Sequence, residues 1–160
     1  MFKATRELIN ARQRFCIYKL NVVPVTQLGG GIPNDCFENA FNSKNRARGI
    51  GVVSGWVVSP YDASNKSTEI IQHWWNADSD GKHFDTTPFI GKNWEYIVDM
   101  DICEYGQQHY DDVDSCVASS LLLKDGRYFA VSEINFNLQL RLIDDLSTEN
   151  LFRDQLLLAA

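Results

Sequence analysis

The sequence has no long hydrophobic segment and no continuous apolar N-terminus. No run of hydrophobic residues exceeds five, whereas a helix needs about 20 apolar residues to span a bilayer. The first residues, MFKATRELINARQRF, alternate charged and apolar side chains and lack the apolar core of a signal peptide. We therefore expect a cytoplasmic protein that makes no contact with membranes.

Positive charge and paired cysteines are also scarce. The formal net charge is −6, and the only local basic cluster is formed by Lys44, Arg46 and Arg48. A nucleic-acid partner is not expected, because binding phosphates requires a basic surface. The four cysteines include no CxxC pair, so in a cytosolic chain they are expected to be free thiols.

The composition itself is that of a globular protein. With 160 residues, 44% of them hydrophobic, the chain is long enough to bury a core without disulfides. We expect a single domain over residues 1–160, with an N-terminal helix and strand (1–30), a core (31–100) and a C-terminal hairpin and helix (101–160). No linker or repeat divides it.

Hydrophobic periodicity and turn residues predict an alternation of helices and strands. Helices are expected over 4–14, over 36–45 after an N-cap at Asn34 or Asp35, and after a cap at Ser147 or Thr148. Strands are expected over 15–25, 49–59, 68–77, 82–87 and 94–102, with a hairpin over 119–134 around Asp125–Gly126. Residues 104–115 are expected to be irregular, and 135–146 fit no one pattern. This order predicts an α+β domain with helices packed on one mainly antiparallel sheet.

The stretch HWWNADSDGKHFDTTP, from His73 to Pro88, contains two of the three histidines. If its two strands pair about Ser79, His73 faces Asp85 and Trp75 faces His83, all on one face of the sheet. Opposed Cβ atoms lie about 5 Å apart, so a carboxylate there can hold an imidazole N–H. A histidine oriented by a carboxylate is the base of a nucleophilic site.

Cys36 is the matching nucleophile candidate. A glycine-rich loop, TQLGGGIPND, leads into it, and the N-cap places its sulfur in the first turn of a helix. The unpaired N–H groups and the helix dipole favour a thiolate there and can stabilise an oxyanion. Cys16 and Cys103 lie in strand-like segments, and Cys116 lies in an acidic region that disfavours a thiolate.

The order Cys36, then His73-x-Trp75, a short turn and Asp85-x-Thr87-Pro88 resembles the transglutaminase-like branch of the papain-like cysteine enzymes. The superfamily also includes the NlpC/P60-like amidases, and the resemblance covers roughly residues 30–88. It implies a papain-like or transglutaminase-like α+β core, in which the helix that carries the cysteine packs on a mainly antiparallel sheet.

The resemblance also implies roles for individual residues. Cys36 would be the nucleophile, His73 the general base and then acid, and Asp85 its orienting residue. A side-chain donor upstream, Gln27 or Asn34, would complete the oxyanion hole. The expected activity is acyl transfer on a protein or peptide-like substrate without a cofactor, with hydrolysis favoured over transamidation. Glycines 29–31 and the loop 59–67 are expected to border the cleft.

The sequence also allows other interpretations. His83 is a rival base, and Cys36, His73 and His83 could bind zinc together with Cys103 or Cys116. The acidic run 104–114 with His109 could bind a cation, although a solvated loop is the simpler interpretation. Trp56, Trp74 and Trp75 are expected to pack rather than to stack on a ligand. A non-catalytic binding or inhibitory protein that engages a basic partner through the acidic surface 100–116 is the alternative function.

Overall fold

The computed structural model describes residues 1–88, 91, 93–109, 118–134 and 137–158. The described helices are α1 (Lys3–Arg12), α2 (Cys36–Arg46), α3 (Met100–His109) and α4 (Thr148–Leu158), and a 3₁₀ helix (Gln13–Phe15) follows α1. None of the described helices is both long enough and apolar enough to cross a membrane.

The strands form one mainly antiparallel sheet. Their order across the sheet is β1 (Asn21–Val23), β6 (Glu95–Val98), β3 (Gly51–Val58), β4 (Ser67–Ala77), β7 (Ser120–Lys124), β8 (Arg127–Ile134) and β9 (Asn137–Ile143). Beside this path, β5 (His83–Asp85) pairs antiparallel with β4 and parallel with β2 (Val25–Gln27). The protein is therefore an α+β protein, as its pattern of helices and strands predicts.

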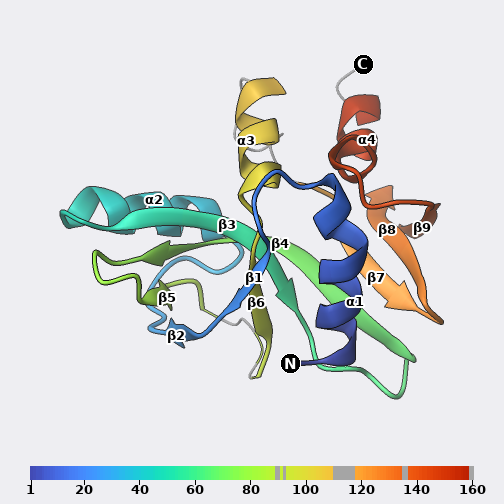
Figure 1. The fold of residues 1–160 in the computed structure, drawn as a ribbon, viewed down its shortest axis with the longest axis horizontal. Coiled ribbons are helices and arrows are strands. Elements are labelled where there is room, and N and C mark those ends of the chain that lie inside the picture. Colours follow the sequence, from blue (N-terminus) through green and yellow to red (C-terminus); the bar gives the residue numbers. More distant parts are fainter. Residues whose placement is uncertain (89–90, 92, 110–117, 135–136, 159–160) are drawn as a thin grey trace.

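The helices cover one face of this sheet. In Figure 1, α1 crosses the sheet in front of β4 and β7, α3 and α4 stand at one end, and α2 lies along the left side. The core between the sheet and helices α1, α3 and α4 is formed by buried side chains that include Leu8, Trp56, Ile70, Ile97 and Phe152. Because side chains alternate along a strand, the odd-numbered residues of β4 point to the opposite face. There Trp75 packs in a second cluster with Val53, Val57 and Tyr96, and His73 shares this face.

The predicted strand 15–25 is wrong in its extent. Residues 13–15 continue as the 3₁₀ helix, and Pro24 separates β1 from β2. Proline has no N–H to donate to a ladder, and here the chain changes partner: β1 pairs with β6, whereas β2 pairs with β5.

The prediction of a strand up to residue 102 is also wrong. Strand β6 ends at Val98, and α3 begins at Met100 and continues through residues expected to be irregular. The carboxylate of Asp99 accepts a hydrogen bond from the N–H of Ile102 at 3.4 Å, which is the action of an N-cap. Residues 110–117 of the acidic segment lie outside the described residues.

The predicted hairpin and the predicted cap of the last helix are confirmed. Strands β7 and β8 form the hairpin around Asp125 and Gly126, whose φ angles of 50° and 72° are both positive, as a type I′ turn requires. Before α4, the Ser147 hydroxyl accepts a hydrogen bond from the N–H of Asn150 at 3.4 Å. Within 135–146, residues 137–143 form strand β9.

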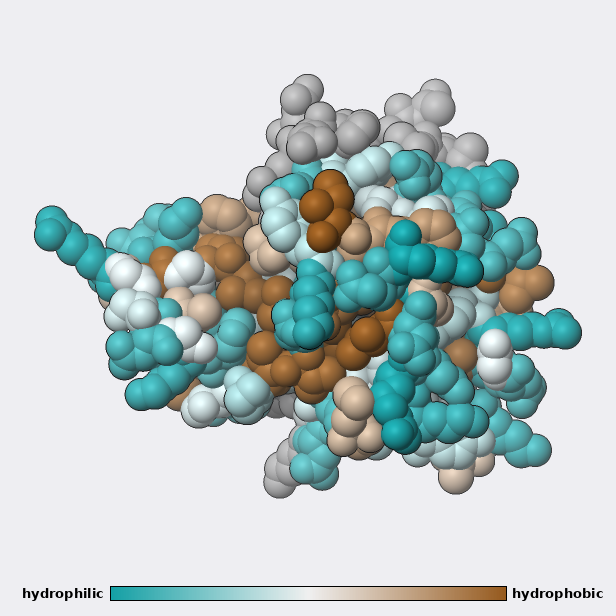
Figure 2. Space-filling model, viewed as in Figure 1, coloured by the Kyte–Doolittle hydropathy of each residue, from teal (hydrophilic) through white to brown (hydrophobic). Residues whose placement is uncertain are grey.

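Part of the hydrophobic surface is exposed. Figure 2, in the same view, shows hydrophobic surface in the middle of this face, to the left of α1, with hydrophilic side chains around it. The strand at the far edge, β9, exposes Leu138, Leu140 and Leu142 by 74%, 52% and 46%. Apolar surface therefore remains both in the middle of this face and on the edge strand β9.

Candidate active site

Three elements bring Cys36, His73 and Asp85 together. Cys36 is the first residue of α2, His73 lies in the middle of β4, and Asp85 ends β5. The two strands belong to one sheet, and α2 lies against β4 through an edge-to-face contact of Phe37 with Trp74, whose ring centroids are 5.5 Å apart.

His73 and Asp85 are joined by a buried hydrogen bond. The distance between His73 Nε2 and Asp85 Oδ2 is 2.7 Å, and the side chains are 3% and 1% exposed. The expected register between their strands is wrong, because the ladder pairs Asn76 with Phe84 and Ala77 with His83. This register is shifted by two residues, which keeps every side chain on its expected face. The imidazole therefore reaches the carboxylate diagonally rather than directly across the strands.

The first turn of α2 lies near a stretch of β4 that is paired with β3 on one edge and with no described strand on the other. Among the described residues, pairing of β4 with β7 ends at Ile70, and pairing with β5 begins at Asn76. The side chain of Asn76 donates a hydrogen bond to the carbonyl of Ala40 in α2 at 2.8 Å. His73 lies within the intervening stretch of β4, so a residue at the start of α2 can approach its side chain.

The thiol of Cys36 interacts with the His73 imidazole. Burial lowers the pKa of His73, but its hydrogen bonds to Asp85 and Cys36, together with the charges of both groups, raise the pKa to about 9. Nε2 of the ring faces Asp85, so Nδ1 is the nitrogen that remains for the thiol. The arrangement allows His73 to carry a proton beside the sulfur while Asp85 holds the opposite side of the ring.

Asp85 is ionised although it is buried. Burial raises the pKa of Asp85, but the hydrogen bond and charge of His73, the N–H of Thr87 and the hydroxyl of Tyr96 together hold it below its usual value. Thr87 N donates to Oδ1 at 2.8 Å, and the Tyr96 hydroxyl donates to Oδ2 at 2.8 Å. The carboxylate is therefore fixed by donors on both of its oxygens.

Gln27 lies on the Asp85 side of the site. Its amide nitrogen donates to Asp85 Oδ2 at 3.4 Å and also to the hydroxyl oxygen of Tyr96. Both N–H groups of this amide thus have acceptors already, which does not favour the expected role of Gln27 as an oxyanion donor. That role stays a prediction.

Asn34 and the start of α2 are the remaining candidates for an oxyanion hole. Asn34 is exposed and adopts a left-handed φ of 60° just before the N-cap residue Asp35. The side chain of Asp35 makes no capping hydrogen bond. First-turn N–H groups that lack a cap can receive a developing negative charge.

Asn39 is a site-forming residue that the sequence does not reveal. Its side chain accepts from the N–H of Ile32 at 2.8 Å, donates to the carbonyl of Ile32 at 2.7 Å, and lies 3.3 Å from the Thr87 hydroxyl. A Cβ added at Gly31 would lie 2.5 Å from Asn39 Oδ1. The glycine therefore allows the loop before Cys36 to approach α2 closely, and Asn39 ties that loop to the segment after Asp85.

His83 forms its hydrogen bond with Trp75 rather than with Asp85. Its Nδ1 accepts a hydrogen bond from Trp75 Nε1 at 3.0 Å, and burial holds the pKa of His83 below its usual value. The Trp75 ring lies parallel to the His73 imidazole, with centroids 6.2 Å apart and an interplanar angle of 16°. His83 thus supports a wall of the site, and His73 is the histidine beside Cys36.

Within the described residues, one group of side chains offers three possible metal ligands, and it includes none of Cys36, His73 and His83. It comprises Cys16, Asp99 and Asp101. Burial and the Asp99 charge raise the pKa of Cys16 to about 12. Asp99 accepts from Arg12 and Trp56, each at 2.9 Å, so it is engaged in anchoring α1. The proposed zinc ligand Cys116 lies outside the described residues, as do the side chains of Cys103 and His109.

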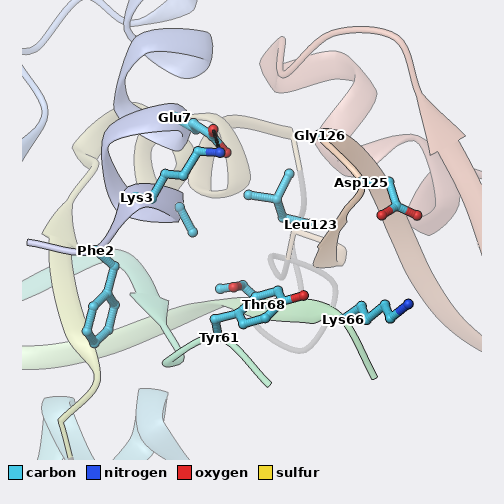
Figure 3. A pocket seen from close by; sticks show the side chains of 10 residues that line it. Phe2, Lys3, Glu7, Tyr61, Lys66, Thr68, Leu123, Asp125 and Gly126 are labelled. Carbon is cyan, nitrogen blue, oxygen red and sulfur yellow. Dashed lines mark ion pairs between the residues drawn. The ribbon is translucent and has the colours of Figure 1, made fainter. Parts of the chain in front are cut away.

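Several cavities are lined by residues of the loops that were expected to border the cleft. One of about 210 Å³ is lined by glycines 29–31 together with Asn39, Arg46 and Thr86, among others, along α2. A second, of about 500 Å³, is lined by Tyr61 and Lys66 of the loop 59–67. Figure 3 shows it between α1 and the β7–β8 hairpin. This second cavity is also lined by Thr68, whose side chain points to the helix-covered face of the sheet. The loop 59–67 therefore borders a cavity on the face opposite to His73.

Comparisons with protein families, with curated proteins and with solved structures find no match for this chain.

Proposed function

We propose that this protein is a cysteine-dependent acyl-transfer enzyme with a Cys36–His73–Asp85 triad on a papain-like or transglutaminase-like core. The observation that carries the proposal is the buried hydrogen bond of 2.7 Å between His73 Nε2 and Asp85 Oδ2, with the Cys36 thiol at the same imidazole. A nucleophile, a base and an orienting carboxylate in this order define the apparatus of covalent catalysis.

The first half-reaction forms a thioester. His73 holds the thiol proton while the Cys36 sulfur attacks the carbonyl carbon of an amide, isopeptide or ester bond. The carbonyl oxygen becomes an oxyanion near the first-turn N–H groups of α2. When the tetrahedral intermediate collapses, the bond to the leaving group breaks and His73 protonates the departing nitrogen or oxygen.

The second half-reaction releases the acyl group. His73, now neutral, accepts a proton from water, and the resulting hydroxide adds to the thioester carbonyl. Collapse breaks the carbon–sulfur bond, yields a carboxylic acid and returns the proton to Cys36. An amine in place of water would give transamidation; hydrolysis of a protein or peptide-like substrate in the cytoplasm, without a cofactor, is the function that we favour.

An electrophilic activity probe tests nucleophile and reaction class together. The protein is incubated with a peptide-like acyl or vinyl electrophile, digested, and the modified cysteine identified by mass spectrometry. We expect Cys36 to be modified first and the modification to disappear in Cys36→Ser. Preferential labelling of Cys16, Cys103 or Cys116 would contradict the proposal and favour a non-catalytic binding protein.

A further inference from the structure

The Asp85 carboxylate depends on side chains for its orientation. The β4–β5 ladder pairs only Asn76 with Phe84 and Ala77 with His83, so backbone pairing does not extend to His73. On one side the carboxylate is held by Thr87 N, which donates to Oδ1. The other oxygen, Oδ2, accepts the hydrogen bond from His73. The groups that hold Oδ2 in place therefore determine the geometry of this hydrogen bond.

Tyr96 contacts both members of this pair. Its hydroxyl donates to Asp85 Oδ2 at 2.8 Å, the same oxygen that meets His73 Nε2 at 2.7 Å. Its ring meets the imidazole edge-on, with centroids 5.9 Å apart and an interplanar angle of 69°. Tyr96 is only 4% exposed, so water has little access to compete for its hydrogen bond to Asp85.

Gln27 determines where the Tyr96 proton points. Gln27 is paired with Asp85 in the parallel β2–β5 ladder, and its amide nitrogen donates to the Tyr96 oxygen. An amide N–H only donates, so the Tyr96 oxygen must accept there and its own proton is directed to Asp85. The chain of donors runs from Gln27 through Tyr96 to Asp85.

We propose that Tyr96 is a positioning residue that holds the Asp85 carboxylate against His73, with Gln27 orienting the Tyr96 hydroxyl. This inference rests on the proposed function of the Cys36–His73–Asp85 triad. Tyr96 acts through Asp85 and takes no part in the bonds that form or break. Without it, Oδ2 keeps its attraction for the imidazole and the longer hydrogen bond of 3.4 Å from Gln27 Nε2, but loses the shorter hydrogen bond of 2.8 Å that fixes its direction.

The test is Tyr96→Phe, which removes the hydroxyl and keeps the ring. In protein labelled with ¹⁵N-histidine, the His73 signals are assigned by their loss in His73→Gln, and the His73 pKa is measured by NMR titration. We expect the pKa to fall by about one unit and the Nε2–H proton to exchange faster with water. The matched control is Tyr128→Phe, because the buried Tyr128 hydroxyl has no hydrogen-bond partner among the described residues; it should leave the His73 titration unchanged.

A second variant keeps the proposal testable if Tyr96→Phe does not fold. Gln27→Leu, at an exposed position, removes the donor to the Tyr96 oxygen and the 3.4 Å donor to Asp85 Oδ2, and it should also lower the His73 pKa. A His73 pKa that is unchanged or higher in both variants would overturn the proposal, because removing a donor from an already well-placed carboxylate strengthens its pull on the imidazolium. If the electrophilic probe labels Cys36 while the His73 pKa is unchanged in these variants, only the positioning role fails. If His73 responds as expected and Cys36 stays unlabelled, only the proposed function fails.

Discussion

His73 and Asp85 meet through their side chains across a part of the sheet where their backbones do not pair. Their nitrogen and oxygen lie 2.7 Å apart, although the β4–β5 ladder ends at Asn76 and Phe84. Both residues are almost fully buried, so the pair is a strong electrostatic interaction in a medium that screens it little. It governs both the chemistry proposed for Cys36 and the response of the fold to pH.

The first prediction concerns stability at alkaline pH. The folded protein raises the pKa of His73 to about 9, above the value of about 6.5 expected in the unfolded chain. The protonated imidazole therefore stabilises the fold, fully below about pH 6.5, and this contribution is lost as the pH rises through about 9. The loss is on the order of 3 kcal/mol. Urea unfolding at several pH values between about 6 and 10 measures it.

The control for this measurement is His73→Gln, which cannot titrate at this position. Its free energy of unfolding should fall less over the same pH range. Equal falls in the two proteins would show that His73 does not hold an additional proton in the folded state.

At acid pH the opposite linkage applies to Asp85, because its pKa is lowered in the folded protein. Ionised Asp85 stabilises the fold above its unfolded pKa of about 4, and this stabilisation is lost as the pH falls through its folded pKa.

The second prediction concerns the buried ion pair that anchors α1. Arg12 Nε lies 2.9 Å from Asp99 Oδ2, and both side chains are fully buried. Arg12→Met leaves the carboxylate buried without its partner and should lower the free energy of unfolding by about 3–5 kcal/mol. Lys3→Met is the control, because the Lys3–Glu7 pair on the same helix is exposed and is worth less than about 1 kcal/mol. Similar losses from the two substitutions in chemical denaturation would contradict this account.

The third prediction concerns Gly55, which faces His73 across the β3–β4 ladder. A Cβ at this position would lie 1.9 Å from the carbonyl oxygen of Ile97 in β6. Gly55→Ala should therefore force β3 and β6 apart and cost more than about 2 kcal/mol. Gly51→Ala on the same strand meets its nearest atom, the carbonyl oxygen of Ala77, at 3.8 Å and should cost less than half as much. Thermal unfolding compares them, and equal midpoints would be inconsistent with the close approach.

The elements that the sequence predicts correctly carry strong local signals. The hairpin at Asp125–Gly126 uses residues that accept a positive φ, and α4 follows a serine cap. The shared face of His73 and Asp85 could also be predicted, because a two-residue shift in register leaves the alternation of side chains intact. Of the fold, the α+β class and most of these elements follow from local patterns.

The parts that could not be predicted depend on contacts between distant segments. Tyr96 reaches Asp85 only because β6 pairs with β3, and Gln27 reaches it through a parallel ladder between β2 and β5. No spacing within the sequence encodes either register. The sequence does not indicate the start of α3, because Met100 to Ile102 alternate in polarity as in a strand. In the structure, the Asp99 carboxylate caps a helix at this point.

The most direct test of the central claim is the rate of Cys36 alkylation as a function of pH. Iodoacetamide labelling followed by peptide mapping gives the rate at each cysteine in one experiment. Cys16, whose pKa is raised to about 12, is the internal control and should stay unreactive near neutral pH. We predict that at about pH 6 Cys36 reacts at least about tenfold faster than free cysteine, and that His73→Gln abolishes this advantage. A Cys36 rate no higher than that of free cysteine, or one unchanged by His73→Gln, would contradict the triad.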